Sequence, residues 1–99
     1  RPIIPTGCDH NAHMYYLLLH NLTDRTAFIN GMKQQEINCV FHYIPLHSSP
    51  EGLVCGRTAG MLPNTSDLSE RLVRLPLWVG LATSGLKKVI DSIENLLNH

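Results

Sequence analysis

The segment His42-Tyr43-Ile44-Pro45-Leu46-His47 places a phenol and two imidazoles close together. On a strand, His42 and Tyr43 would point to opposite faces, and Pro45 would then turn the chain so that His47 opens the following loop. A hydroxyl and an imidazole can together bind a phosphate or a sugar hydroxyl. Aromatic residues at strand ends are also often only core. The pattern therefore leaves binding and plain packing open for these residues.

A second group consists of Cys8, His10 and His13. Thiolate and imidazole are good zinc ligands. The spacing matches no well-known zinc module, however, and a fourth ligand would have to come from a distant part of the chain. We therefore expect no metal site, and we interpret the group as a loop whose imidazoles are solvated or line a cleft.

The positions of the lysines argue against a Schiff-base lysine on this chain. Lys33, Lys87 and Lys88 are its only lysines, and each falls on the polar face of an expected helix. A Schiff-base lysine needs a desolvated, electropositive pocket that lowers its pKa, and none of these positions offers one. Ser48 and Ser49 lie outside any nucleophile-elbow pattern. We expect no catalytic residue on this chain.

Composition narrows the class of protein. Ninety-nine residues suggest one domain with a thin core, spanning 1–99. Eight basic and eight acidic side chains leave no cationic excess for nucleic acid, and no apolar stretch is long enough for a membrane span. The odd number of cysteines (Cys8, Cys39, Cys55) indicates reduced thiols in a cytoplasmic protein. The start at Arg1 instead of Met suggests an excised fragment or a processed product.

The elements expected from periodicity are three strands and three helices. A six-residue apolar run within 13–20 predicts a strand buried on both faces, with a short buried helix as the rival interpretation. A helix over 24–36, capped by Thr23 or Asp24, would bury Phe28, Ile29 and Met32. Alternation predicts a strand over 38–43.

The second half begins with a long loop over 45–63. A helix over 66–73 follows, capped by Asn64 or Thr65, and then an edge strand over 74–78 that contains Pro76. An apolar stripe predicts a final helix capped by Thr83 or Ser84. The expected fold class is α+β, in the order β-α-β-loop-α-β-α, with a small sheet of about three strands and three helices packed mainly on one face.

Four runs in this order resemble the C-terminal part of the DegT-type sugar-nucleotide aminotransferases. They are Arg1-Pro2-Ile3-Ile4-Pro5, His10-Asn11-Ala12-His13-Met14-Tyr15-Tyr16, the segment from Val40 to Pro50, and Ser69-Glu70-Arg71-Leu72-Val73-Arg74-Leu75-Pro76-Leu77-Trp78. The two most specific are His-Tyr-x-Pro-Leu-His and Ser-Glu-Arg-Leu-x-x-Leu-Pro-Leu. The run 53–64 departs from the family pattern, so substrate preference is expected to differ there.

The resemblance implies a fold-type I enzyme in which a large domain holds pyridoxal phosphate on a lysine and a small C-terminal domain closes the active site. The parent enzyme would move an amino group from glutamate to a nucleotide-linked 4-keto-6-deoxy sugar, using the cofactor as electron sink. No cofactor is expected to bind this chain alone. Expected partners are the missing large domain, the nucleotide sugar, glutamate and a second protomer, with neither nucleic acid nor membrane.

The same resemblance selects site residues. Tyr43 and His47 are the first candidates for contacting the sugar nucleotide near its diphosphate, and Asn11 and His13 could line the same cleft. His42 stays open between that cleft and buried structure. The alternative function, from another class, is a free-standing nucleotide-sugar-binding or His-rich metal-binding module.

Overall fold

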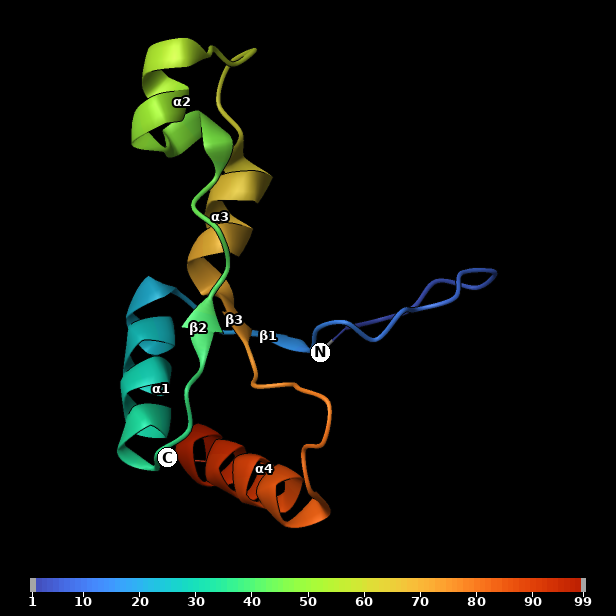
Figure 1. Ribbon diagram of the computed structural model, residues 1–99. Helices are drawn as coiled ribbons and strands as arrows, with labels where there is room; N and C mark the ends of the chain where they lie inside the picture. Colours follow the sequence, from blue (N-terminus) through green and yellow to red (C-terminus); the bar gives the residue numbers. More distant parts are fainter. Residues whose placement is uncertain (1, 99) are drawn as a thin grey trace.

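The computed structural model describes residues 2–98 as a small antiparallel sheet with helices (Figure 1). The expected α+β class with three strands is confirmed. One helix and one short 3-10 turn come in addition to the expected elements. In chain order the elements are β1 (Tyr16–Leu18), α1 (Leu22–Gln34), β2 (Val40–Phe41), η1 (Leu46–Ser48), α2 (Pro50–Cys55), α3 (Pro63–Arg71), β3 (Leu72–Arg74) and α4 (Thr83–Leu97).

The strand latest in sequence, β3, lies at the centre of the sheet, in the order β1-β3-β2. It pairs with β1 through Leu17 opposite Val73, and with β2 through Phe41 opposite Val73. The expected edge strand over 74–78 is therefore wrong in position and in role. Pro76 lies beyond the strand, so that every residue of β3 keeps the N–H that a central strand needs.

The first strand is shorter and less covered than expected. β1 holds three residues, and Leu18 keeps 41% of its surface exposed. The expectation of burial on both faces is wrong because helices α1 and α4 cover only one face of this sheet (Figure 1).

The core lies between that face and the two helices. Phe28 and Met32 of α1 pack with Val73 and with Val89 of α4. Helix α1 starts two residues earlier than expected, because Asn21 is its cap: the Asn21 side-chain oxygen accepts a hydrogen bond from the Asp24 N–H at 2.8 Å. Thr23 and Asp24 lie inside the helix instead.

The expected last helix is confirmed as α4, although its N-cap is Ala82, without a side-chain hydrogen bond, and not Thr83 or Ser84. The apolar stripe of α4 is wider than the part of it that packs against the core. Val89, Ile93 and Leu96 contact the core. Leu86, Ile90 and Leu97 remain 46–51% exposed. We call these three residues the outer face of α4.

Residues 45–63 are not one long loop. Ser49 caps α2 by accepting a hydrogen bond from the Gly52 N–H at 3.0 Å, and Pro50 occupies the first turn, where its missing N–H costs nothing. Helix α3 likewise begins at Pro63, without the expected cap from Asn64 or Thr65. Asp67 sits one turn further along and pairs with Arg71 at 2.8 Å.

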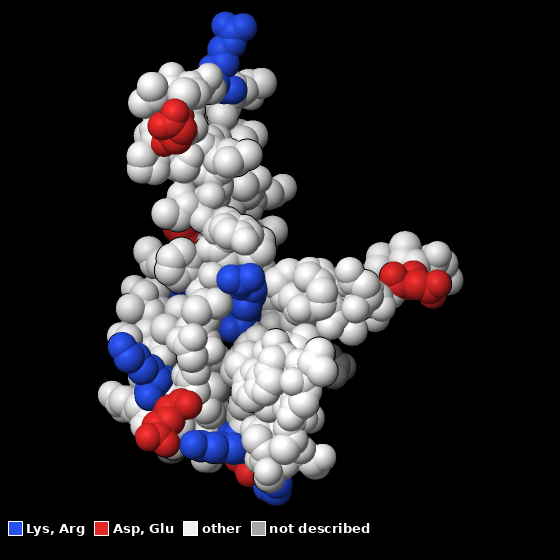
Figure 2. Space-filling view, in the orientation of Figure 1, with Lys and Arg blue, Asp and Glu red and all other residues white. Residues whose placement is uncertain are grey.

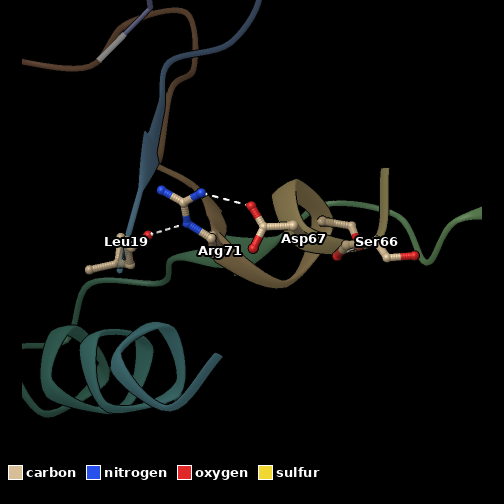
Figure 3. A network of polar contacts seen from close by, with 5 residues as sticks. Leu19, Ser66, Asp67 and Arg71 are labelled. Atoms are coloured by element: carbon tan, nitrogen blue, oxygen red, sulfur yellow. Dashed lines mark hydrogen bonds and ion pairs between the residues drawn. The ribbon is translucent and has the colours of Figure 1, made fainter. Parts of the chain in front are cut away.

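Two parts of the chain project from this core, as Figure 1 shows: residues 2–15 form an arm on one side, and α2 with α3 forms a column on another. The radius of gyration is 15.8 Å, whereas a compact domain of this length has about 13 Å. Arg71 anchors the base of the column (Figure 3), because its Nε donates to the Leu19 carbonyl at 2.8 Å.

Candidate functional site

The face of the sheet opposite α1 and α4 carries the arginine that lies beside the candidate Tyr43. Side chains alternate along a strand. Val73 is fully buried beneath the helices, so its neighbour Arg74 points to the opposite, open face, where Val40 of β2 lies beside it. Strand β2 ends at Phe41, and His42 and Tyr43 follow it directly.

Tyr43 and Arg74 lie together there. The Arg74 guanidinium carbon is 5.8 Å from the centre of the Tyr43 ring, within the range of a cation–π contact. The His42 ring meets the same phenol edge-on, at 5.1 Å between centroids. These three side chains line an open hollow of about 580 Å³, and Tyr43 is 77% exposed. An exposed aromatic residue beside a cation is a suitable surface for an anionic, partly apolar ligand.

His47 occupies a neighbouring hollow. It lies on η1, and its Nε2 is 3.2 Å from the Ser66 hydroxyl of α3. This second hollow, of about 550 Å³, is lined by the column and includes Arg57. Leu46 lines both hollows, so the Tyr43 and His47 sites adjoin without sharing one pocket.

Asn11 and His13 lie on the projecting arm. The Asn11 side-chain oxygen is 2.6 Å from His13 Nδ1. An amide oxygen only accepts, so Nδ1 carries the hydrogen and Nε2 is left free for a ligand. His13 lines a smaller hollow of about 170 Å³, and Arg74 lines this hollow as well.

The structure thus places Tyr43, His47 and His13 in three separate hollows, and Arg74 lines two of them. Asn11 lines none of these hollows and contacts the site only through His13. Sequence reasoning missed Arg74 as a site residue. The available signal was its place next to Val73: an arginine that follows a strand's buried residue must lie on the other face of the sheet. The expected strand over 74–78 hides this signal, because it begins at Arg74 and leaves Val73 outside the strand.

The remaining chemical candidates take other roles. Within residues 2–98, no group of three His, Cys, Asp or Glu side chains is arranged to hold a metal ion. Over the same residues, no helix combines the length and apolar character that a membrane crossing requires.

The lysines do not fit the covalent attachment of pyridoxal phosphate. Lys87 donates to Asp91 at 2.7 Å, and this hydrogen bond, together with the charge of Asp91, raises the pKa of Lys87. A Schiff-base lysine needs the opposite shift. Lys33 is exposed, and Lys88 lies 4.0 Å from Glu36. No step of a pyridoxal reaction is therefore assigned to a lysine of this chain.

Comparisons with known proteins agree with this architecture. The family model of the DegT/DnrJ/EryC1/StrS aminotransferase family matches residues 2–94. An uncharacterized protein of Methanocaldococcus jannaschii is 29% identical over 102 residues, which cover 99% of this chain and 26% of that protein.

Among solved structures, the crystal structure of the aminotransferase TlmJ from Streptoalloteichus hindustanus superposes with a TM-score of 0.84 at 24% identity. The match covers 98% of this chain and 25% of TlmJ, and at this identity it shows a shared fold. The chain thus spans about a quarter of the length of the proteins it resembles.

Proposed function

This chain belongs to the DegT/DnrJ/EryC1/StrS aminotransferase family, and we propose that it is the C-terminal small domain of a pyridoxal-phosphate transaminase. The proposed reaction moves an amino group from glutamate to a nucleotide-linked 4-keto-6-deoxy sugar. We propose a substrate of the dTDP-4-amino-4,6-dideoxygalactose transaminase type, for surface-polysaccharide or deoxysugar biosynthesis. The observation that carries the reaction class is the family match over residues 2–94.

The proposal divides the work between two parts of the protein. Pyridoxal phosphate supplies the electron sink for the transfer when it is bound. The paired or exposed lysines of this chain support placing the cofactor lysine in the large domain of the parent protein. The contribution of the small domain is then to bind and orient the nucleotide sugar. Tyr43 and His47 are its principal contacts, and Asn11 and His13 contribute from the arm.

The exposed apolar surface supports the large domain as partner. Ile3 is 88% exposed on the arm and Val54 is 82% exposed on the column. Apolar surface spread over two projections and over the outer face of α4 is typical of a unit that docks against other protein. We include a second protomer among the partners, as a homodimer, and we include neither nucleic acid nor a membrane. The three free thiols support a cytoplasmic location.

The full-length protein that contains this chain tests the reaction. Purified protein with pyridoxal phosphate, glutamate and a dTDP-4-keto-6-deoxy sugar should release 2-oxoglutarate, measured by a coupled dehydrogenase assay. Tyr43→Phe and His47→Gln should raise the KM for the sugar nucleotide by about tenfold, because each loses one hydrogen bond to a charged group. Ser66→Ala, which removes the partner of His47 but not its imidazole, is the matched control. Absence of sugar-dependent 2-oxoglutarate would refute the reaction.

The 99-residue chain alone tests the division of work. We propose that it is inactive. After incubation with pyridoxal phosphate and borohydride, mass spectrometry should find no defined phosphopyridoxyl-lysine. Stoichiometric labelling of Lys33, Lys87 or Lys88 alone would contradict the assignment of the cofactor lysine to the large domain.

A further inference from the structure

Two buried polar atoms without a hydrogen-bond partner lie in side chains that line the same hollow. They are Arg74 Nε and His42 Nδ1. The only other such atom found among residues 2–98 is Arg25 Nε, whose guanidinium lies over the Phe41 ring at 4.9 Å. A buried polar group without a partner costs free energy, so native proteins rarely keep one without a reason. Because both side chains line one hollow, the part of the chain that the structure describes leaves their hydrogen-bonding capacity unused beside that hollow.

The charge of the hollow is positive and uncompensated. Over residues 2–98, the ion pairs involve Arg71, Lys87 and Lys88, and Arg74 takes part in none. Figure 2 shows Lys and Arg atoms near the middle of the molecule, in the region of β2 and β3. Arg74 is only half-buried, so a ligand arriving from solvent can reach its guanidinium. The ligand that fits is therefore an anion.

The geometry favours an anion with more than one charged group. Arg74 lines both the hollow with Tyr43 and the smaller one with His13, so its planar donors lie between two sets of side chains. A guanidinium can donate two parallel hydrogen bonds to one phosphate. The imidazoles of His13 and His42 lie in the hollows on either side of it. A diphosphate has the length and the number of acceptors to use both sides, whereas a single carboxylate uses one.

We propose that Arg74 is a substrate-binding residue that donates hydrogen bonds to the diphosphate of the nucleotide sugar. The Tyr43 ring lies 5.8 Å from the guanidinium carbon, and the His42 ring lies beside that of Tyr43. This inference rests on the proposed function for the identity of the ligand, and it adds the residue that neutralises the ligand's charge.

Direct binding tests the inference without turnover. The full-length protein is titrated with dTDP by isothermal calorimetry. Arg74→Gln should weaken binding by roughly ten- to a hundredfold, the effect of losing hydrogen bonds between charged groups. Arg74→Lys, which keeps the charge but loses the planar fork, should weaken it less. Lys33→Gln removes a cation from the far end of α1 and should bind dTDP like the original protein. Equal affinity of Arg74→Gln and the original protein, or no dTDP binding by the original protein, would overturn the proposal.

KM values then distinguish an effect on sugar-nucleotide binding from an effect on glutamate binding. Arg74→Gln should raise the KM for the sugar nucleotide and leave the KM for glutamate within twofold. A rise confined to glutamate would overturn the assignment to the diphosphate. If the original protein binds dTDP through Arg74 but transfers no amino group, the proposed reaction fails and the anion site stands. Thermal unfolding of each variant checks that it is folded. If both Arg74 variants lose dTDP binding because they unfold, Tyr43→Ala is tested instead. This variant should weaken dTDP binding while the protein stays folded.

Discussion

Gly31 of α1 lies directly beneath the side chain of Leu96 of α4, where a Cβ at position 31 would come within 2.8 Å of Leu96 Cδ2. A glycine inside a helix costs about 1 kcal/mol relative to alanine. The structure shows what the glycine permits, which is the close approach of the two helices that cover the sheet.

A double-mutant cycle measures this relationship. In the original chain, the propensity gained by Gly31→Ala is offset by the displacement of Leu96, so the free energy of unfolding should change by less than about 1 kcal/mol. In a Leu96→Ala background, where the clash is gone, the same change should stabilise by about 1 kcal/mol. Urea unfolding gives both values. Equal effects in the two backgrounds would show that Leu96 does not constrain position 31.

Arg71 makes two contacts of unequal worth (Figure 3). Its ion pair with Asp67 is solvent-exposed, with 61% of the Asp67 side chain accessible, and such pairs contribute about 0–1 kcal/mol. Its bond to the Leu19 carbonyl is partly buried and joins α3 to the end of β1. Asp67→Ala should therefore lower the free energy of unfolding by less than about 1 kcal/mol, and Arg71→Ala by about 1–3 kcal/mol. The prediction fails if Asp67→Ala costs as much as Arg71→Ala in urea denaturation.

The three thiols should react with iodoacetamide at different rates. Cys39 is 2% exposed, and burial raises its pKa, so it should react last, upon unfolding. Cys55 is exposed, but its hydrogen bond to Glu51 at 2.9 Å raises its pKa and lowers its thiolate fraction at pH 8. Glu51→Gln should therefore speed alkylation of Cys55 and leave Cys39 unchanged, as followed by peptide mass spectrometry. Unchanged labelling of Cys55 would mean that the Glu51 contact does not form in solution.

The burial of Cys39 makes the stability of the folded chain depend on pH. Because the folded thiol has a raised pKa, the folded state retains a proton that the unfolded chain releases above about pH 8.5. Stability from this group is complete below that pH and is lost as the pH rises through the folded pKa. Cys39→Ala should flatten the alkaline fall of stability in urea midpoints measured between pH 7 and 10. An equally steep fall in the variant would assign it to other groups.

The outer face of α4 should make the isolated chain self-associate. Leu86, Ile90 and Leu97 are about half exposed and lie on one side of the helix. In the 99-residue chain we expect sedimentation to show dimers or larger species at high concentration. Leu86→Glu with Ile90→Glu should shift the profile toward monomer, and Asn95→Glu, which adds charge elsewhere on α4, should not. A monomeric profile of the unaltered chain would contradict this expectation.

Local sequence predicted the elements that depend on local causes. The stripe in 83–97 and the apolar positions of α1 predicted two helices, since amphipathic periodicity is written in the residues themselves. It missed α2, whose signal is only a serine cap and Pro50 within a run rich in glycine and proline. It also misplaced β3, because Pro76 follows the strand instead of interrupting it.

For the candidate site, the sequence by itself determined which chemistry is present: the phenol of Tyr43, the imidazoles and the unsuitable lysines. Only the tertiary structure decided which of these groups meet. Tyr43 and Arg74 are 31 positions apart and come together because β3 pairs with both other strands, through contacts that no local pattern encodes. His47, beside Ser66 of α3, and His13, on the arm, line two further hollows, each of which shares at least one lining residue with the hollow of Tyr43. Residue types follow from the sequence, whereas their proximity depends on long-range pairing and burial, which are properties of the whole fold.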